Sequence, residues 1–152
     1  MPGLPKCTPV RRIVCLLILT VLLSSCTGED RPTAPQAGQT LKNHILSLLK
    51  ERGARNITVT DPGGRNVPCA DGKAKQTFAA TGFDVARTTS RETIRSMLLG
   101  ALDRVAPYKI VNPGPMAAAI HVVNAAAHTK LVLDAPKDGF YLVSGTTDCL
   151  AP

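Results

Sequence analysis

Residues 89–105 read TSRETIRSMLLGALDRV, and this stretch decides the fold class because it contains the clearest element of the chain. Its apolar residues recur at the spacing of one helical face: Ile94, Met97, Leu98, Ala101, Leu102 and Val105. Thr89 and Glu92 predict a capping box at its start. Pro107 predicts its end, because a proline disfavours helical backbone in the residue before it. A helix with one apolar stripe needs a second layer against which to bury that stripe.

A second amphipathic stretch lies upstream, over residues 40–53. Thr40 is placed to cap the start of a helix, and Gly53 is placed to end it. Between them, four apolar residues share one helical face: Leu41, Ile45, Leu48 and Leu49. We therefore expect two helices, one before the strands and one among them.

The rest of the domain alternates strand-forming segments with turn residues. We expect strands over residues 57–60, 73–83, 108–111, 119–125, 129–134 and 140–144. Residues 116–127 are rich in alanine, and a helix is the alternative there. The β-branched residues at 120, 122 and 123 favour a strand. The predicted fold is α+β, with two helices packed on one face of a mostly antiparallel sheet.

The beginning of the chain carries a different kind of signal. Lys6, Arg11 and Arg12 precede an apolar run over residues 13–23, which is broken only by Thr20. At roughly 1.5 Å per residue this run spans about 16 Å as a helix, too short for a bilayer core of about 30 Å. A charged start followed by a short apolar run is typical of a secretory signal.

Leu23-Ser24-Ser25-Cys26 follows at the end of that run and resembles the lipobox of bacterial lipoproteins. In that family the cysteine thiol receives a diacylglyceryl group, and the signal is then removed. The resemblance implies that residues 1–25 are removed and that lipid on Cys26 anchors the protein to the outer face of the bacterial cell membrane. An ordinary cleaved signal is the alternative, but it does not require a cysteine at the cut.

The predicted lipoprotein signal also predicts the domain boundaries. We expect residues 26–39 to form the lipidated cysteine and a disordered tether, and residues 40–152 to form a single α+β domain. Removal of the signal lowers the formal charge from +7 to +4, because three cations leave with it. The remaining cations are scattered and not interleaved with aromatic residues, so the sequence predicts no nucleic-acid partner. Weak attraction to anionic lipid or wall polymer is all that this charge supports.

The cysteine count predicts one disulfide. Cys7 and Cys15 lie in the signal, and Cys26 is taken by lipid. Cys69 and Cys149 remain, in a chain delivered to an oxidising compartment, and we expect them to be bridged. A reactive thiol or a metal-binding pair is the alternative, but neither cysteine belongs to a Cys-x-x-Cys motif.

Catalytic and metal-binding motifs are weak. The chain has no Gly-x-Ser-x-Gly motif of a serine hydrolase. His121 and His128 flank the expected hairpin, but zinc sites usually need three or four protein ligands, so we predict no metal site. We expect His44 on the polar side of the first helix. Residues 61–65 (DPGGR) are typical of a hairpin turn, with an anion-binding backbone nest as the alternative.

Aspartates also occur near turns, where such side chains commonly bond their own backbone. They are Asp71, Asp84, Asp134, Asp138 and Asp148. No pair of them is assigned a catalytic role, and no cofactor is predicted.

Two short segments resemble small actinobacterial lipoproteins of uncharacterised function: residues 67–73 (VPCADGK) and 145–150 (GTTDCL). The resemblance implies the same disulfide and an α+β domain, and it carries no catalytic residues. We therefore expect a membrane-anchored, non-catalytic envelope module that binds a partner protein, a wall polymer or a small ligand. The alternatives are a carrier of lipid or another apolar ligand, which needs a cavity between helices and sheet, and a small hydrolase.

Overall fold

The computed structural model describes residues 31–112 and 118–152. The predicted signal and Cys26, the predicted site of lipidation, lie outside these residues. Among the described residues, no helix is both long enough and apolar enough to cross a membrane.

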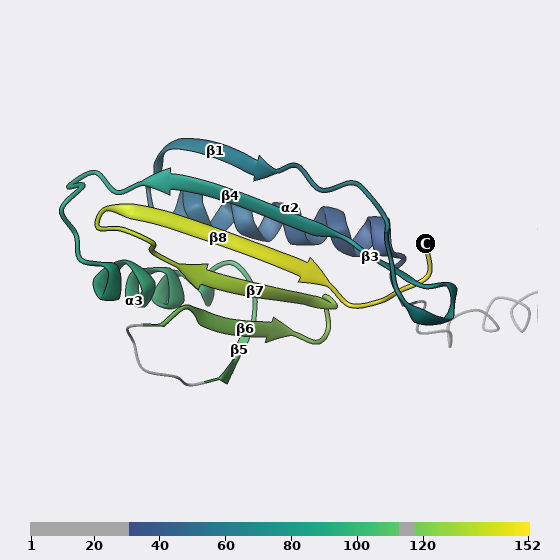
Figure 1. Cartoon of the computed structure of the whole chain (residues 1–152). Helices are drawn as coiled ribbons and strands as arrows, with labels where there is room; N and C mark the ends of the chain where they lie inside the picture. The colour runs from purple at the N-terminus through teal and green to yellow at the C-terminus, as the bar shows by residue number, and fades with distance from the viewer. Residues whose placement is uncertain (1–30, 113–117) are drawn as a thin grey trace, which may run out of the picture. The chain divides into compact units, whose positions relative to one another are not determined.

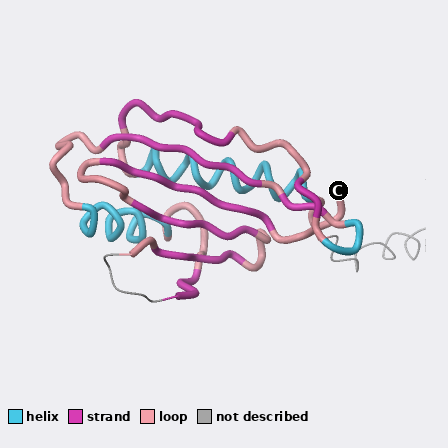
Figure 2. The backbone as a smooth tube through the Cα atoms, viewed as in Figure 1, coloured by secondary structure: helices cyan, strands magenta, loops and turns pink. Residues whose placement is uncertain are grey.

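Two helices, α2 (Ala34–Glu51) and α3 (Arg91–Leu102), pack on one face of a six-stranded antiparallel sheet (Figure 1). The strand order is β1-β4-β8-β7-β6-β5. The strands are β1 (Arg55–Asp61), β4 (Thr77–Phe83), β5 (Lys109–Asn112), β6 (Ile120–Asn124), β7 (Thr129–Asp134) and β8 (Phe140–Thr147). A small ribbon of β2 (Val67–Pro68) and β3 (Ala74–Lys75) lies beside one end of the sheet (Figure 2). The predicted fold class is confirmed.

The core forms where alternate strand residues meet the apolar stripes of the helices. Strand periodicity places one set of side chains toward the helices, and these are almost fully buried: Phe78, Ala80, Val122, Leu131, Leu133, Tyr141 and Val143. The helices contribute Leu41, Ile45, Leu48, Leu49, Ile94, Leu98 and Leu102. Each large aliphatic side chain buried in this way contributes about 2 kcal/mol to stability.

The first helix begins earlier than predicted. α2 starts at Ala34, inside the predicted tether of residues 26–39, and Thr33 rather than Thr40 is its N-cap. The backbone N–H of Gln36 donates to Thr33 Oγ1, and the backbone N–H of Thr33 donates to Gln36 Oε1. This capping box stabilises the start of the helix. The proline in the first turn is compatible with it, because N–H groups there have no intrahelical acceptor.

The second helix confirms its predicted stripe but not its predicted cap. Ser90 is the N-cap of α3, and its Oγ accepts from the backbone N–H of Thr93 at 3.3 Å. Thr89 Oγ1 instead donates to Asp84 Oδ2 at 2.6 Å. Two adjacent hydroxyl residues make such a shift by one position hard to predict.

The predicted disulfide is present. Cys69, in the bend between β2 and β3, is bridged to Cys149, just after β8, with the two Cα atoms 6.1 Å apart. The strand that precedes Cys149 is not an edge strand, because β8 lies between β4 and β7 in the middle of the sheet. The bridge instead holds the carboxyl-terminal segment against the small β2–β3 ribbon.

Candidate functional site

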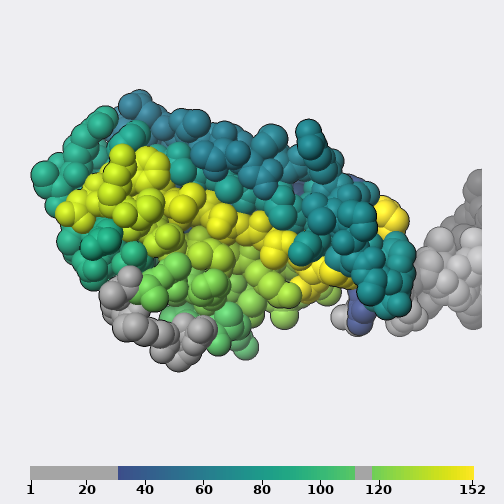
Figure 3. Space-filling model, viewed as in Figure 1, coloured from purple at the N-terminus to yellow at the C-terminus, as the bar shows by residue number. Residues whose placement is uncertain are grey.

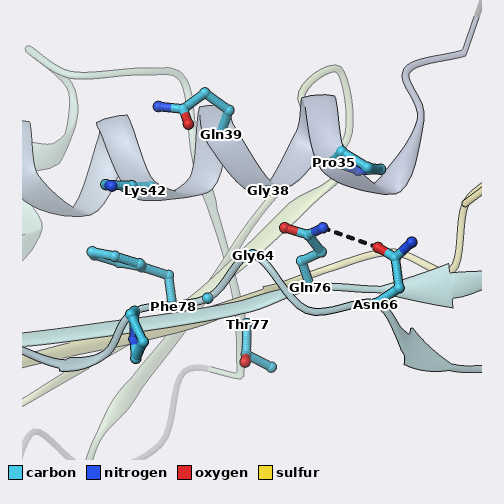
Figure 4. Close-up of a pocket in the computed structure, with 11 residues that line it drawn as sticks. Pro35, Gly38, Gln39, Lys42, Gly64, Asn66, Gln76, Thr77 and Phe78 are labelled. Atoms are coloured by element: carbon cyan, nitrogen blue, oxygen red, sulfur yellow. Dashed lines mark hydrogen bonds between the residues drawn. The ribbon is translucent and has the colours of Figure 1, made fainter.

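A polar cleft opens between the amino-terminal half of α2 and the segment that leaves β1 (Figure 4). Its volume is about 390 Å³, which is at the small end of the range of ligand sites. Helix, loop and strand side chains all line it: Pro35, Gly38, Gln39, Lys42, Pro62, Gly63, Gly64, Asn66, Gln76, Thr77 and Phe78. We call this site the polar cleft.

Gln76 forms the floor of the polar cleft. It lies between β3 and β4 and is only 5% exposed. Its backbone N–H donates to Thr147 Oγ1, and its backbone carbonyl accepts from the N–H of Thr147. Its side-chain Nε2 donates to Asn66 Oδ1 at 2.9 Å. The side chain is therefore held in one orientation before any ligand arrives.

A glycine in α2 makes room for this amide. A Cβ atom on Gly38 would overlap Gln76 Oε1, so a larger residue cannot be accommodated without moving Gln76. Gly38 itself is buried. Glycine at this position therefore allows the helix and the strand to approach closely, and it is not needed for a turn.

The Oε1 atom of Gln76 faces the polar cleft (Figure 4), and no described residue donates a hydrogen bond to it. Among the described residues, Arg52 Nε is the buried side-chain polar atom without a hydrogen-bond partner, so Gln76 Oε1 is open to solvent in the cleft. Water or a ligand hydrogen-bond donor can therefore reach this oxygen. This oxygen is the strongest sign that the cleft is a binding site.

Gln39 and Lys42 complete the helix side of the polar cleft. Gln39 Nε2 donates to Asn43 Oδ1 at 3.0 Å, and the Gln39 side chain extends from the edge of the α2 ribbon that faces away from Gln76 (Figure 4). Lys42 Nζ lies 5.9 Å from the centre of the Phe78 ring, a cation–π distance. The cleft thus presents the Gln76 carbonyl oxygen as an acceptor and Lys42 as a cation.

The loop side is shaped by Asp61 and two glycines. The backbone N–H of Gly63 donates to Asp61 Oδ1 at 3.0 Å. Gly63 and Gly64 both have positive φ values, +66° and +77°, which glycine adopts without strain. Hydrogen bonds from Thr77 and from the Gly63 N–H hold the pKa of Asp61 below its usual value.

The predictions for this loop need correction. It is not the turn of a hairpin between successive strands, because β1 pairs with β4. An anion nest here loses one of its donors, because the Gly63 N–H is already bonded to Asp61. The loop instead forms one wall of the cleft.

A second surface is the sheet face that carries no helix among the described residues, which we call the open face. Figure 3 shows it toward the viewer, with β8 in yellow across its middle. Register places Ala79, Ser144, Val132 and His121 in one row across β4, β8, β7 and β6. A shallow hollow of about 480 Å³ lies over this row. Its side chains are mostly small or aliphatic, in contrast to the amides of the polar cleft.

The structure does not bring the two hairpin histidines together in one site. His121 is exposed on the open face, in register with Val132. His128 lies at the β6–β7 turn, where its Nδ1 is 3.2 Å from Asp148 Oδ2. Lys130 Nζ also contacts Asp148, at 2.8 Å. Hydrogen bonds from Lys130 and then from His128 lower the pKa of Asp148.

His44 is half-buried, so its predicted place on the polar side of the first helix is wrong. Its Nδ1 lies 2.9 Å from the hydroxyl of Tyr108, which lies 2.7 Å from Thr129 Oγ1. Burial lowers the pKa of His44. This chain of polar groups links α2 to β7 and is part of the fold, not of a cleft.

Three of the aspartates near turns, Asp84, Asp134 and Asp148, bind side chains that are distant in sequence. Asp84 accepts from the hydroxyls of Thr89 and Tyr141, and the Thr89 hydrogen bond is the main cause of its lowered pKa. Asp134 accepts from Arg95 Nε at 3.1 Å and also from the next backbone N–H. In the parts of the chain that the structure describes, no three His, Cys, Asp or Glu side chains are grouped to hold a metal ion.

Comparison with known proteins gives a likeness of fold. No protein-family model matches the sequence, and no curated protein matches it. The crystal structure of a DUF4853 family protein from Actinomyces odontolyticus is similar, with a TM-score of 0.52 at 9% sequence identity. The match covers 84% of this chain and 73% of that chain. At this identity the likeness concerns the fold alone.

Proposed function

We propose that the chain is a lipid-anchored, non-catalytic binding module of the bacterial envelope, and that it holds a small polar ligand in the polar cleft. The observation that carries the proposal is Gln76. Gln76 is only 5% exposed, its backbone makes two hydrogen bonds to Thr147, and its side-chain nitrogen donates to Asn66, yet its side-chain oxygen has no donor among the described residues. Preorganised polar groups of this kind give a ligand site its orientation and specificity.

The chemistry of the lining favours binding over catalysis. The cleft side chains offer amides, one ammonium group and one hydroxyl. A hydrolase needs a nucleophile with a base at hydrogen-bond distance, and the described lining residues do not form such a pair.

A carrier of lipid is less well supported. The space between helices and sheet is filled by side chains such as Leu41, Leu98 and Tyr141, each with no exposed area. A lipid between the layers would have to displace them, at a cost of several kcal/mol.

The anchor is the second part of the proposal and rests on Cys26. Since α2 begins at Ala34, seven residues separate Cys26 from the helix. Fully extended, they reach about 25 Å, so we expect the domain to be held close to the membrane surface. Metabolic labelling with a fatty-acid probe tests the anchor: the Cys26→Ala variant should incorporate no label. Undiminished label in this variant would refute the lipid anchor.

The cleft is tested by NMR on the full chain in detergent, with glucose, glucuronate, glucosamine and glycylglycine as separate probes. At least one probe should shift the side-chain amide signals of Gln76. The Gly38→Ala variant should lose this response, because the added methyl group overlaps the Gln76 amide. Gly100→Ala is the matched control, since it places the same methyl group on a helix in open space. If no probe shifts Gln76 in the unmodified chain, the proposed function is wrong.

A further inference from the structure

We infer that the ligand of the polar cleft is a saccharide unit that carries an acidic group. This inference rests on the proposed function and specifies its ligand. Three features of the cleft support it: the Gln76 carbonyl oxygen, which has no donor among the described residues, the cation of Lys42, and a described lining without a carboxylate.

The carbonyl oxygen of Gln76 defines what the ligand must donate. This oxygen lies between α2 and the loop after β1 (Figure 4). Hydroxyl, amide N–H and ammonium groups are the donors from which such an oxygen accepts. A ring with several hydroxyl groups can donate to it from more than one position.

The positive charge of Lys42 disfavours a ligand that donates through an ammonium group. Its Nζ lies over Phe78 at the cleft, and none of the described lining residues is a carboxylate that would neutralise a second cation. Asp61 is the nearest carboxylate along the chain, but it accepts from Thr77 and from the Gly63 N–H, and it lines the hollow on the open face. A neutral donor is therefore favoured, and a ligand carboxylate or phosphate gains from Lys42.

The shape of the cleft separates a saccharide from a peptide. A bound peptide usually pairs with a strand edge or places apolar side chains in pockets. The cleft lies between a helix and a loop, and its one aromatic residue, Phe78, is 2% exposed. Pro35 and Pro62 line it instead, and their C–H groups suit the faces of a sugar ring. Because no aromatic platform stacks on that ring, hydrogen bonds and Lys42 must provide most of the affinity.

Three sugars with the same ring test the inference: glucuronate, glucose and glucosamine, titrated against the full chain in detergent at low salt. Glucuronate should bind roughly fivefold tighter than glucose, as expected for one partly exposed ion pair, and glucosamine should bind more weakly than glucose. Added salt should reduce the preference for glucuronate, because it screens the charge of Lys42.

Lys42→Gln should abolish the preference for glucuronate while leaving glucose binding in place. Lys50→Gln is the matched control, because Lys50 is exposed in the last turn of the same helix, and this variant should keep the preference. Equal binding of glucose and glucuronate, or a preference that survives Lys42→Gln, would overturn the inference. So would a response of Gln76 to glycylglycine alone. These outcomes leave the proposed function intact. If none of the four probes shifts the Gln76 signals, both the proposed function and this inference are wrong.

Discussion

The two halves of α2 pack against the sheet in different ways. The carboxyl-terminal half buries large side chains, among them Ile45, Leu48 and Leu49, in the main core. The amino-terminal half buries Ala34 and Ala37 in a separate small cluster with Ala74 and Leu150. The helix from Leu41 onward therefore interlocks with the sheet through its side chains, and the turns before it approach the sheet closely through their backbone.

This difference explains why the cleft lies where it does. Small residues let helix and strand come close at Gly38, but they fill less of the space beside that contact. The gap is lined by Gln76 and the loop after β1 instead of by leucine side chains. The cleft thus lies at the end of the helix where the buried side chains are smallest. The disulfide and the capping box stabilise that end of the helix.

Removal of the disulfide should have the largest effect, and it should act on the amino-terminal half of α2. The bridge closes a loop with a sequence separation of 80 residues. The double variant Cys69→Ser with Cys149→Ser should lose about 4 kcal/mol of unfolding free energy in urea denaturation. Hydrogen exchange should accelerate most at the Ala34 amide, which donates to the carbonyl of Ala151. Equal acceleration at Leu48 would contradict the distinction between the two halves.

Leu48→Ala should have the next largest effect, and it should act on the other half. Leu48 has no exposed area and packs in the main core. The cavity left behind should cost about 3 kcal/mol in urea denaturation. The side-chain signals of Gln76 should stay unchanged in the folded variant. A shift of those signals would show that the core and the cleft are coupled.

Gly38→Ala should cost less, about 2 kcal/mol, because the methyl group forces the Gln76 side chain to move. Gly100→Ala should instead raise stability by up to about 1 kcal/mol, because alanine is the better helix former and the methyl group meets nothing. Thermal denaturation of the two variants gives the comparison. Equal stabilisation by both would mean that helix and strand do not pack tightly at Gly38.

The sequence predicted the part of this picture that depends on large apolar residues. The stripe of α3, the β6–β7 hairpin and the predicted pairing of Cys69 with Cys149 are confirmed. The helix stripe and the hairpin could be predicted because they follow from local sequence periodicity. The disulfide could be predicted because only two cysteines remain once the signal and Cys26 are set aside. The position of β8 in mid-sheet was missed, because it depends on pairing with β4 and β7, which are distant in sequence.

The polar cleft was missed for a related physical reason. Its helix wall begins in a segment with prolines and small residues, which has the composition of a tether. Alanine and glycine add little to an apolar pattern, so the start of α2 at Ala34 left no hydrophobic signal. The capping pair of Thr33 and Gln36 was the available clue. Contact between Gly38 and Gln76 depends on tertiary packing that no local pattern encodes.

The smallest expected effect is a pH dependence from His44, which joins the cleft-bearing helix to the sheet. Burial lowers the pKa of His44 in the folded state below the unfolded value of about 6.5. The unfolded chain therefore binds the proton more readily, and stability should fall as the pH drops below about 6.5. The loss should level off once the pH is below the folded pKa, and it should be modest because the side chain is only half-buried.

Urea denaturation between pH 5 and 7.5 measures this effect, with His44→Gln as the comparison. Asp84 has a lowered pKa, so its contribution stays constant above about pH 5 and does not enter this window. The variant should lose the slope that His44 causes. It should also keep a hydrogen-bond partner for Tyr108, because the glutamine amide both donates and accepts. If the free energy of unfolding of the variant changes with pH as in the unmodified chain, another group causes the pH dependence. The contact between His44 and Tyr108 would then have no role in acid stability.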